Sequence, residues 1–137
     1  METITNNPIE TFNLGKQLAG SLSSGDIVAL YGGLGAGKTV FAKGIASGLS
    51  IIEDVVSPTF TLLKQYEGDL KLHHFDLYRI EDEEELQHIG FHDYLGGEGV
   101  CVIEWAEHAG ELPPCVEVHL RGSGSDERTI EIKGLQV

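Results

Sequence analysis

The segment GGLGAGKT, residues 32–39, has the residue types and the spacing of a phosphate-binding loop. It fits the pattern G-x-x-x-x-G-K-[ST], with Gly32, Gly37, Lys38 and Thr39 on the fixed positions. Glycines allow consecutive backbone N–H groups to turn toward phosphate oxygens, because no Cβ stands in the way. The lysine can reach the β- and γ-phosphates, and the hydroxyl after it can bind Mg²⁺. The sequence therefore predicts a nucleotide site at this loop.

Two acidic residues end apolar runs further along the chain, Asp76 in LHHFD and Glu104 in VCVIE. Both are expected at the carboxyl ends of strands, where open α/β sheets bind their ligands. A phosphate loop usually works with such an acid, which helps to hold Mg²⁺. Two acids permit a division of labour, with one carboxylate on the metal and the other orienting the attacking water.

Two further features near these acids have more than one interpretation. The segment SPTFT, residues 57–61, could carry hydroxyls that sense the γ-phosphate, as switch segments do, or could be a polar entry to a strand. Trp105 is the only tryptophan and directly follows Glu104. Its ring either packs in the core or lies at the rim of the nucleotide pocket or a partner contact.

The apolar pattern predicts the elements that must position these residues. A buried strand over residues 25–33 leads into the loop, and a helix over 40–49 follows it. The other expected elements are a helix over 12–22 with Thr11 as its N-cap, an antiparallel hairpin of residues 57–68 and 71–79, an acidic helix over 81–96, a second buried strand over 99–105, and closing strands over 116–120 and 128–134. Together they predict an α/β fold, a P-loop NTPase-like three-layer sandwich with a mixed sheet and antiparallel C-terminal strands. No linker or repeat divides residues 1–137, so a single domain is expected.

The composition limits the cellular compartment and the kinds of partner that are expected for the chain. The chain carries 22 acidic and 9 basic side chains, which give a net charge of −13. This charge argues against the chain binding a nucleic-acid backbone by itself. No apolar run approaches the ~20 residues that a membrane span needs, and the N-terminus lacks a secretory pattern. Cys101 and Cys115 do not form a C-x-x-C pair, and His88 and His92 have no third ligand at a metal-like spacing. These features predict a cytoplasmic protein without a histidine-based metal site.

The residues also narrow the class of reaction. A Ras-type GTPase would need an N-K-x-D motif, but the only asparagines precede the phosphate loop. A small-molecule kinase usually spends several arginines on its second substrate, and this chain has three, Arg79, Arg121 and Arg128. A minimal ATPase that acts on a partner protein is the main interpretation. A small-molecule kinase and a nucleotide-gated binding module remain as alternatives.

Five segments in this order resemble one family, the TsaE ATPases of bacterial tRNA N6-threonylcarbamoyladenosine (t6A) biosynthesis. They are GGLGAGKTVFAKGIASGL, VVSPTFTLLKQYEG, LHHFDLYR, EEELQHIGFHDYL and VIEWAEH. The phosphate loop is shared with many families, whereas SPTFTL, HFDLYR and IEW together are much more specific. The resemblance runs from about Thr11 to about Leu120.

The resemblance implies a role for each matching residue. ATP would bind to Thr11, Gly33, Leu34, Gly35, Ala36, Gly37, Lys38, Thr39, Val40 and Arg128. Within that set Thr11 would lie near the adenine and Arg128 would reach the nucleotide from the C-terminal strands. Thr39 and Glu104 would bind Mg²⁺, and Lys38, Asp76 and Glu104 would be the catalytic residues, with Asp76 as the acid needed for hydrolysis.

The resemblance also implies partners. TsaD transfers the threonylcarbamoyl group to tRNA, and TsaB pairs with TsaD. A TsaE protein would supply ATP hydrolysis for multiple turnovers of that complex and would not perform the transfer. It would meet tRNA only through the complex, would not bind membranes, and would be a monomer when alone.

Overall fold

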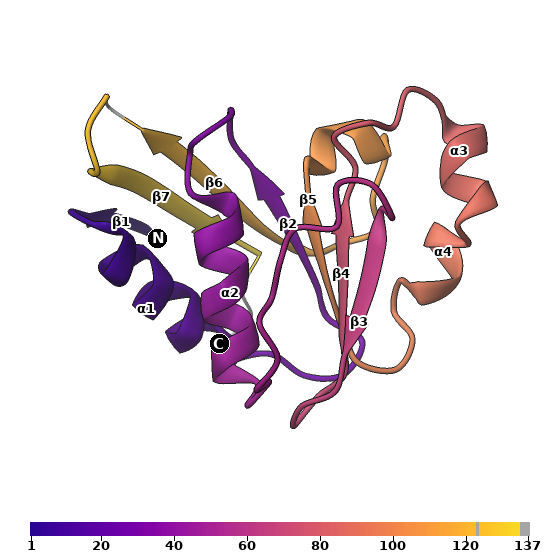
Figure 1. Cartoon of the computed structure of the whole chain (residues 1–137), viewed down its shortest axis with the longest axis horizontal. Coiled ribbons are helices and arrows are strands. Elements are labelled where there is room, and N and C mark those ends of the chain that lie inside the picture. Colours follow the sequence, from indigo (N-terminus) through magenta and orange to yellow (C-terminus); the bar gives the residue numbers. More distant parts are fainter. Residues whose placement is uncertain (123, 135–137) are drawn as a thin grey trace.

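A mixed sheet of seven strands organises the computed structural model, which describes residues 1–122 and 124–134 (Figure 1). The strands are β1 (Glu2–Thr5), β2 (Ile27–Tyr31), β3 (Leu63–Tyr66), β4 (Leu72–Asp76), β5 (Val100–Glu104), β6 (Val116–Gly122) and β7 (Arg128–Lys133). The helices are α1 (Pro8–Ala19), α2 (Lys38–Gly48), α3 (Glu83–His88), α4 (Phe91–Tyr94) and the 3-10 helix η1 (Ala106–Ala109). The strand order is β1-β7-β6-β2-β5-β4-β3. The four central strands are parallel and the pairs at both edges are antiparallel, which confirms the predicted mixed sheet.

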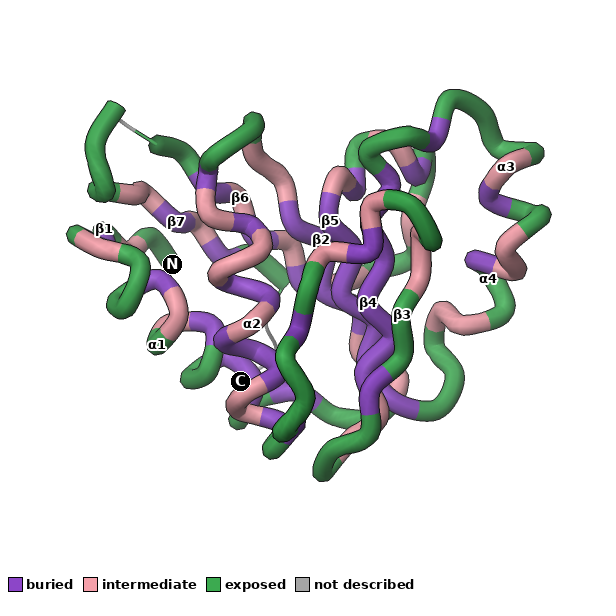
Figure 2. Tube along the Cα trace, in the orientation of Figure 1, coloured by how far each residue is buried: buried purple, intermediate pink, exposed green. Residues whose placement is uncertain are grey.

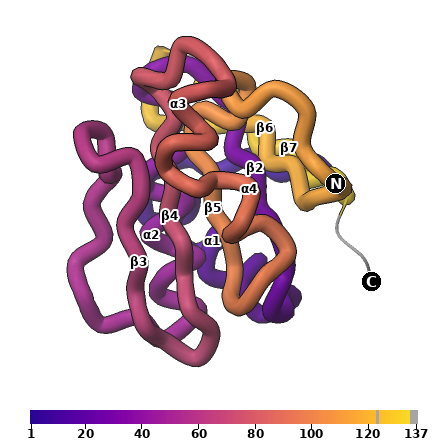
Figure 3. Tube along the Cα trace, turned by 90° about the vertical axis from the view of Figure 1, so that its right-hand side faces the viewer, coloured from indigo at the N-terminus to yellow at the C-terminus, as the bar shows by residue number. Residues whose placement is uncertain are grey.

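Helices cover both faces of the sheet and complete the three predicted layers. On one face lie α1 and α2, and Phe41 and Ile45 of α2 pack against residues of β2 and β5 such as Val102. The central strands are largely buried (Figure 2). On the other face α3, α4 and η1 bury residues such as Phe91 against β4 and β5. A view turned by 90° shows α3 and α4 in front of the sheet (Figure 3). The central strands are therefore apolar on both faces, as expected for buried parallel strands.

Glycines allow α1 and α2 to lie unusually close together. A Cβ on Gly44 of α2 would come 2.0 Å from the carbonyl oxygen of Phe12 on α1. A Cβ on Gly15 of α1 would come 2.4 Å from the carbonyl oxygen of Phe41 on α2. Because the backbones touch at these points, any larger residue must push the helices apart.

Strand β4 is a third buried strand, beyond the two that the sequence predicted. All five of its residues are buried, and it forms the predicted hairpin with β3 while running parallel to β5 on its other side. Only the hairpin partner of β4 is predictable from the sequence, because pairing with a strand about 28 residues later has no local signal.

The N-terminal predictions were wrong in two respects. Helix α1 begins at Pro8 rather than after Thr11, because the Asn7 side chain caps it by accepting from the Glu10 N–H at 2.9 Å. Pro8 suits the first helical position, since no intrahelical N–H bond is needed there. Strand β1, paired with β7, was not expected at all.

Two other boundaries differ from the prediction. Residues 57–62 are not a strand, and β3 begins only at Leu63 because Leu62 adopts a left-handed φ of 69°. The acidic helix divides into α3 and α4 at Gly90, whose φ of 70° suits a glycine. Within the described residues no helix is long and apolar enough to cross a membrane.

Candidate active site

The phosphate loop connects the end of β2 to the start of α2, as the sequence predicted. Gly32 leaves β2 with a φ of 157°, and a Cβ there would lie 2.7 Å from the carbonyl oxygen of Leu120. Gly37 precedes α2 with a left-handed φ of 99°, and no side chain caps the helix. The start of α2 therefore presents backbone N–H groups and the positive end of the helix dipole, both of which favour a bound phosphate.

Lys38 is only 5% exposed and lies within the loop. Its Nζ donates to the carbonyl oxygens of Gly32 and Gly33, the latter at 2.8 Å. The same Nζ lies 3.9 Å from the centre of the Trp105 ring, within range of a cation–π interaction. Burial lowers the pKa of the Lys38 amine, and nearby carboxylates, of which Glu104 is the strongest influence, oppose that shift.

Glu104 ends β5 as a carboxylate that is 2% exposed. Its Oε1 accepts a hydrogen bond from the Thr39 hydroxyl at 2.9 Å, which connects β5 to the first turn of α2. Its Oε2 lies 2.6 Å from Nε2 of His74, a fully buried residue of β4. Both carboxylate oxygens are therefore engaged, as a buried carboxylate requires.

Asp76 ends the neighbouring strand β4 and binds the segment that follows α2. Its Oδ2 accepts from the hydroxyls of Ser57, at 2.5 Å, and of Thr59, at 3.1 Å. Its Oδ1 accepts from the backbone N–H of Tyr78 at 2.9 Å. SPTFT leads into β3, and its hydroxyls at Ser57 and Thr59 also bind it to Asp76.

Trp105 adopts a left-handed φ of 58°, which turns the chain at the end of β5. Its ring contacts the rings of Tyr78, with centres 4.8 Å apart, and His108, with centres 5.7 Å apart. Nδ1 of His108 lies 2.8 Å from the carbonyl oxygen of Leu77, which fixes that imidazole behind the indole. Trp105 is partly buried against the core on the α3, α4 and η1 side of the sheet and also lines the site, so the structure supports part of each interpretation.

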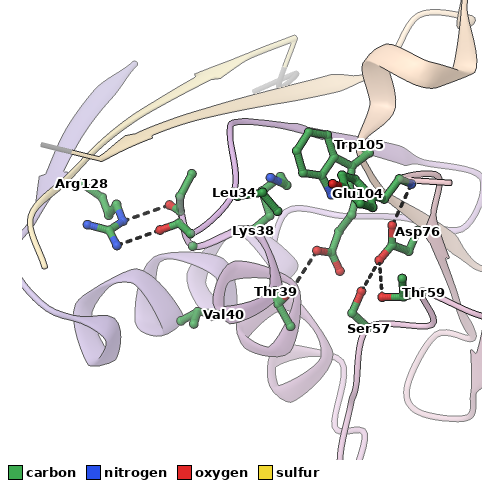
Figure 4. A pocket seen from close by; sticks show the side chains of 14 residues that line it. Leu34, Lys38, Thr39, Val40, Ser57, Thr59, Asp76, Glu104, Trp105 and Arg128 are labelled. Atoms are coloured by element: carbon green, nitrogen blue, oxygen red, sulfur yellow. Dashed lines mark hydrogen bonds between the residues drawn. The ribbon is translucent and has the colours of Figure 1, made fainter. Parts of the chain in front are cut away.

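A cavity of about 520 Å³ brings most of these residues together (Figure 4). Its lining consists of Leu34, Gly35, Ala36, Gly37, Lys38, Thr39, Val40, Ser57, Thr59, Asp76, Tyr78, Glu104, Trp105 and Arg128. Every site residue predicted from the sequence is in this lining except Gly33 and Thr11. Gly33 lines a neighbouring hollow on the side of the loop that faces β6.

Thr11 does not cap a helix but lies buried within α1. Its hydroxyl is 2.7 Å from that of Thr5 on β1. It lines a small cavity beside the main one, together with Gly37, Val40 and Arg128. The residue therefore borders the predicted nucleotide site from the α1 side.

Arg128, the first residue of β7, binds the backbone of the phosphate loop. Its Nε donates to the Ala36 carbonyl oxygen at 3.1 Å, and its Nη2 donates to the Gly35 carbonyl oxygen at 2.9 Å. Nη1 donates to the carbonyl oxygens of Ser125 and Glu127. The guanidinium thus fixes the backbone of the loop at Gly35 and Ala36.

The described side chains of the site do not by themselves supply a complete set of metal ligands. Among the described residues, no group of three or more His, Cys, Asp or Glu side chains is arranged to hold one. The hydroxyl of Thr39 and the carboxylate of Glu104 are oxygen donors placed side by side. Such a pair fits Mg²⁺, which takes one or two protein ligands and completes its shell with water and phosphate.

Sequence reasoning missed two residues of this region. Tyr78 follows Asp76 by two positions, and its ring contacts that of Trp105 at a tilt of 49°, so its nearness to the acid was a usable signal. His74 had no such signal, because a histidine in an apolar run is usually a core residue. Only the strand order places it beside Glu104.

The loop between β2 and α2 and the acids at the ends of adjacent parallel strands define a protein of the P-loop NTPase-like class. A sequence model of the family described as "Threonylcarbamoyl adenosine biosynthesis protein TsaE" matches residues 5–130. The chain belongs to the TsaE family.

Individual relatives agree with this assignment. A tRNA threonylcarbamoyladenosine biosynthesis protein TsaE from Bacillus subtilis is 46% identical over 92% of this chain and 80% of its own length. Its counterpart from Treponema pallidum is 42% identical over 96% of this chain and 99% of its own length. The crystal structure of Bacillus subtilis YdiB superimposes with a TM-score of 0.84 at 38% identity, covering 99% of this chain and 86% of that one. The family match favours the main interpretation over the small-molecule kinase.

Proposed function

We propose that this protein is a Mg²⁺-dependent ATPase that supports t6A modification of tRNA in the cytoplasm, together with the transferase TsaD and its partner TsaB. Its relatives are named for threonylcarbamoyladenosine biosynthesis. The observation that carries the ATPase assignment is the hydrogen bond between Thr39 of the phosphate loop and the buried Glu104. That bond brings together a hydroxyl and a carboxylate, the two side-chain ligands that a triphosphate-bound cation would use in this proposal.

The loop supplies the grip on the phosphates. The N–H groups at the start of α2 would bind phosphate oxygens, and Lys38 would exchange its carbonyl partners Gly32 and Gly33 for the β- and γ-phosphates. Arg128 would keep the loop open by holding the carbonyl oxygens of Gly35 and Ala36 away from the phosphates.

Thr39 and Glu104 would hold the metal through their side-chain oxygens. Bound there, Mg²⁺ would neutralise charge on the β- and γ-phosphate oxygens. The part played by the chain is to present one neutral and one charged oxygen in a fixed arrangement, which the buried setting of Glu104 enforces.

Asp76 would hold the attacking water. A carboxylate offers about four acceptor sites, and the observed contacts of Asp76 use three of them, two on Oδ2 and one on Oδ1. The fourth site, on Oδ1, can accept a hydrogen bond from water while Ser57 and Thr59 remain bound. Those hydroxyls would connect the water position to the segment 57–61.

The charge of the chain supports an indirect role toward tRNA. With a net charge of −13 the protein is poorly suited to binding a phosphate backbone, so tRNA contacts belong to the partners. ATP hydrolysis would then act on the partner complex rather than on a small second substrate.

The decisive measurement is the rate of ATP hydrolysis with and without the TsaB–TsaD pair. We expect partner-stimulated hydrolysis that Lys38→Ala abolishes. Slow hydrolysis unaffected by the partners, with normal ATP binding, would instead indicate a nucleotide-gated binding module. Phosphate transfer to a metabolite without the partners would indicate a kinase.

A further inference from the structure

His74 is a buried histidine whose side chain makes one hydrogen bond within the described part of the chain, and that bond is to a carboxylate of the proposed metal site. It is the middle residue of β4, fully buried, and its Nε2 lies 2.6 Å from Oε2 of Glu104 on β5. The other ring nitrogen, Nδ1, is the one buried side-chain polar atom of the described residues that has no hydrogen-bond partner.

The unpartnered nitrogen shows what this side chain is for. A buried polar atom without a partner destabilises the fold, and an apolar side chain would avoid that penalty only by leaving Oε2 of the buried Glu104 without its partner. The neighbouring His73, by contrast, uses both ring nitrogens, one with Gln65 and one with the Glu98 carbonyl oxygen. The imidazole of His74 therefore engages the Glu104 carboxylate through Nε2 and leaves Nδ1 unpaired.

The two oxygens of Glu104 consequently have separate partners. Oε2 is held by His74 from β4, and Oε1 accepts from Thr39 in α2. A carboxylate held at one oxygen cannot rotate freely about its terminal bond, so its other oxygen keeps facing Thr39. Residues that hold a metal-binding carboxylate in this way usually affect metal affinity although they never touch the metal.

We propose that His74 is a positioning residue that fixes Glu104 for the cation bound beside Thr39. This inference rests on the proposed Mg²⁺–nucleotide site. It assigns a purpose to a residue that would otherwise count only as core. An amide nitrogen at the place of Nε2 should replace its function, whereas an apolar side chain should not.

The test measures metal affinity rather than hydrolysis. Free Mn²⁺ is followed by electron paramagnetic resonance as it is titrated into the protein saturated with the non-hydrolysable analogue AMPPNP, with Mn²⁺ and AMPPNP alone as reference. We expect His74→Leu to weaken Mn²⁺ binding by about tenfold, while AMPPNP binding in EDTA changes less than about twofold. His74→Gln should restore most of the affinity because its amide can donate to Oε2.

The control is His73→Leu, a change in the adjacent buried histidine, which faces the opposite side of the sheet and should leave Mn²⁺ affinity unchanged. Thermal unfolding of each variant checks the fold. If His74→Leu does not fold, His74→Asn is used, because its shorter amide does not reach Glu104.

If the folded His74→Leu or His74→Asn variant bound Mn²⁺ as tightly as the wild type, only the proposed role of His74 would be refuted. An affinity that His74→Gln does not restore would refute the same role. The wild-type complex with AMPPNP could also bind Mn²⁺ no more tightly than free AMPPNP binds it. That result would refute the proposed metal site, and the proposed function with it.

Discussion

Asp76 and Glu104 are register partners at the ends of β4 and β5, yet each carboxylate binds a hydroxyl from a different segment. Glu104 accepts from Thr39 of the phosphate loop, whereas Asp76 accepts from Ser57 and Thr59. The hydrogen bonds therefore separate two acids that the sequence could not distinguish. One is tied to Thr39 at the start of α2 and the other to the segment beyond α2.

This separation predicts different defects for the two amide variants. Asp76→Asn should retain nucleotide and Mn²⁺ binding but lose at least about 100-fold in the rate of ATP hydrolysis, the usual loss when a group that handles the water proton is removed. Glu104→Gln should lose metal affinity as well. For each variant, calorimetry measures nucleotide binding, the Mn²⁺ titration measures metal affinity, and a hydrolysis assay with the partners measures the rate. Equal loss of metal binding in the two variants would contradict the division.

Trp105 should report the state of Lys38. Because Nζ of Lys38 lies against the only indole of the chain, moving the ammonium to a phosphate changes the environment of that ring. We expect ATP to change the intrinsic fluorescence of the wild type, and the change to be absent in Lys38→Ala. A full signal in Lys38→Ala would mean that the indole senses the nucleotide by another route.

Arg128 should act on nucleotide affinity through the loop backbone. Arg128→Ala removes the bonds to the carbonyl oxygens of Gly35 and Ala36, so the loop loses its fixed shape. We expect ATP to bind about tenfold more weakly, which corresponds to about 1.4 kcal/mol. Arg121→Ala is the matched control, since that side chain is 70% exposed and its ion pair among the described residues is with Glu2 at 3.6 Å. Equal affinities in the two variants would argue against this role.

Gly44 should be essential to the packing of α1 against α2. A methyl group there would lie 2.0 Å from the Phe12 carbonyl oxygen, so Gly44→Ala should lower the free energy of unfolding by about 2 kcal/mol or more. Gly20→Ala is the control, because its Cβ would meet only the Gln17 carbonyl oxygen at an ordinary 3.4 Å. Urea denaturation of both variants gives the comparison, and similar stabilities would refute the close contact.

Cys101 predicts how stability depends on pH. Burial raises the pKa of its thiol from 9.0 to about 12, so between these values the native state binds a proton that the unfolded state has lost. The free energy of unfolding should therefore fall as pH rises above about 9, by up to about 1.4 kcal/mol per pH unit from this group. Urea denaturation under reducing conditions at pH 8 to 10.5 should give a steeper fall for the wild type than for Cys101→Ala. Parallel profiles would show that the thiol does not contribute.

Much of the site could be predicted because its signals are local. The phosphate loop is encoded in eight consecutive residues, GGLGAGKT, and its flanking strand and helix have clear apolar patterns. The acids were recognisable as the ends of apolar runs. The continuous apolar run VCVI also indicated a buried strand.

Other features depended on contacts between segments far apart in the chain. Thr39 and Glu104 are 65 residues apart, and they meet because β5 lies directly beside β2 in the sheet. The placement of His74 against Glu104 likewise requires β4 to lie on the other side of β5. No periodicity in the sequence specifies that order.

The sequence by itself thus determined the chemistry that is available, namely a phosphate loop, a hydroxyl and two acids. The tertiary structure alone decided which acid each hydroxyl binds, that Trp105 lies on Lys38, and that Arg128 braces the loop. The physical reason is that residue types and local patterns depend only on residues that are close together in the sequence. Partners, by contrast, are set by strand order and register, which depend on how the whole sheet buries its two faces.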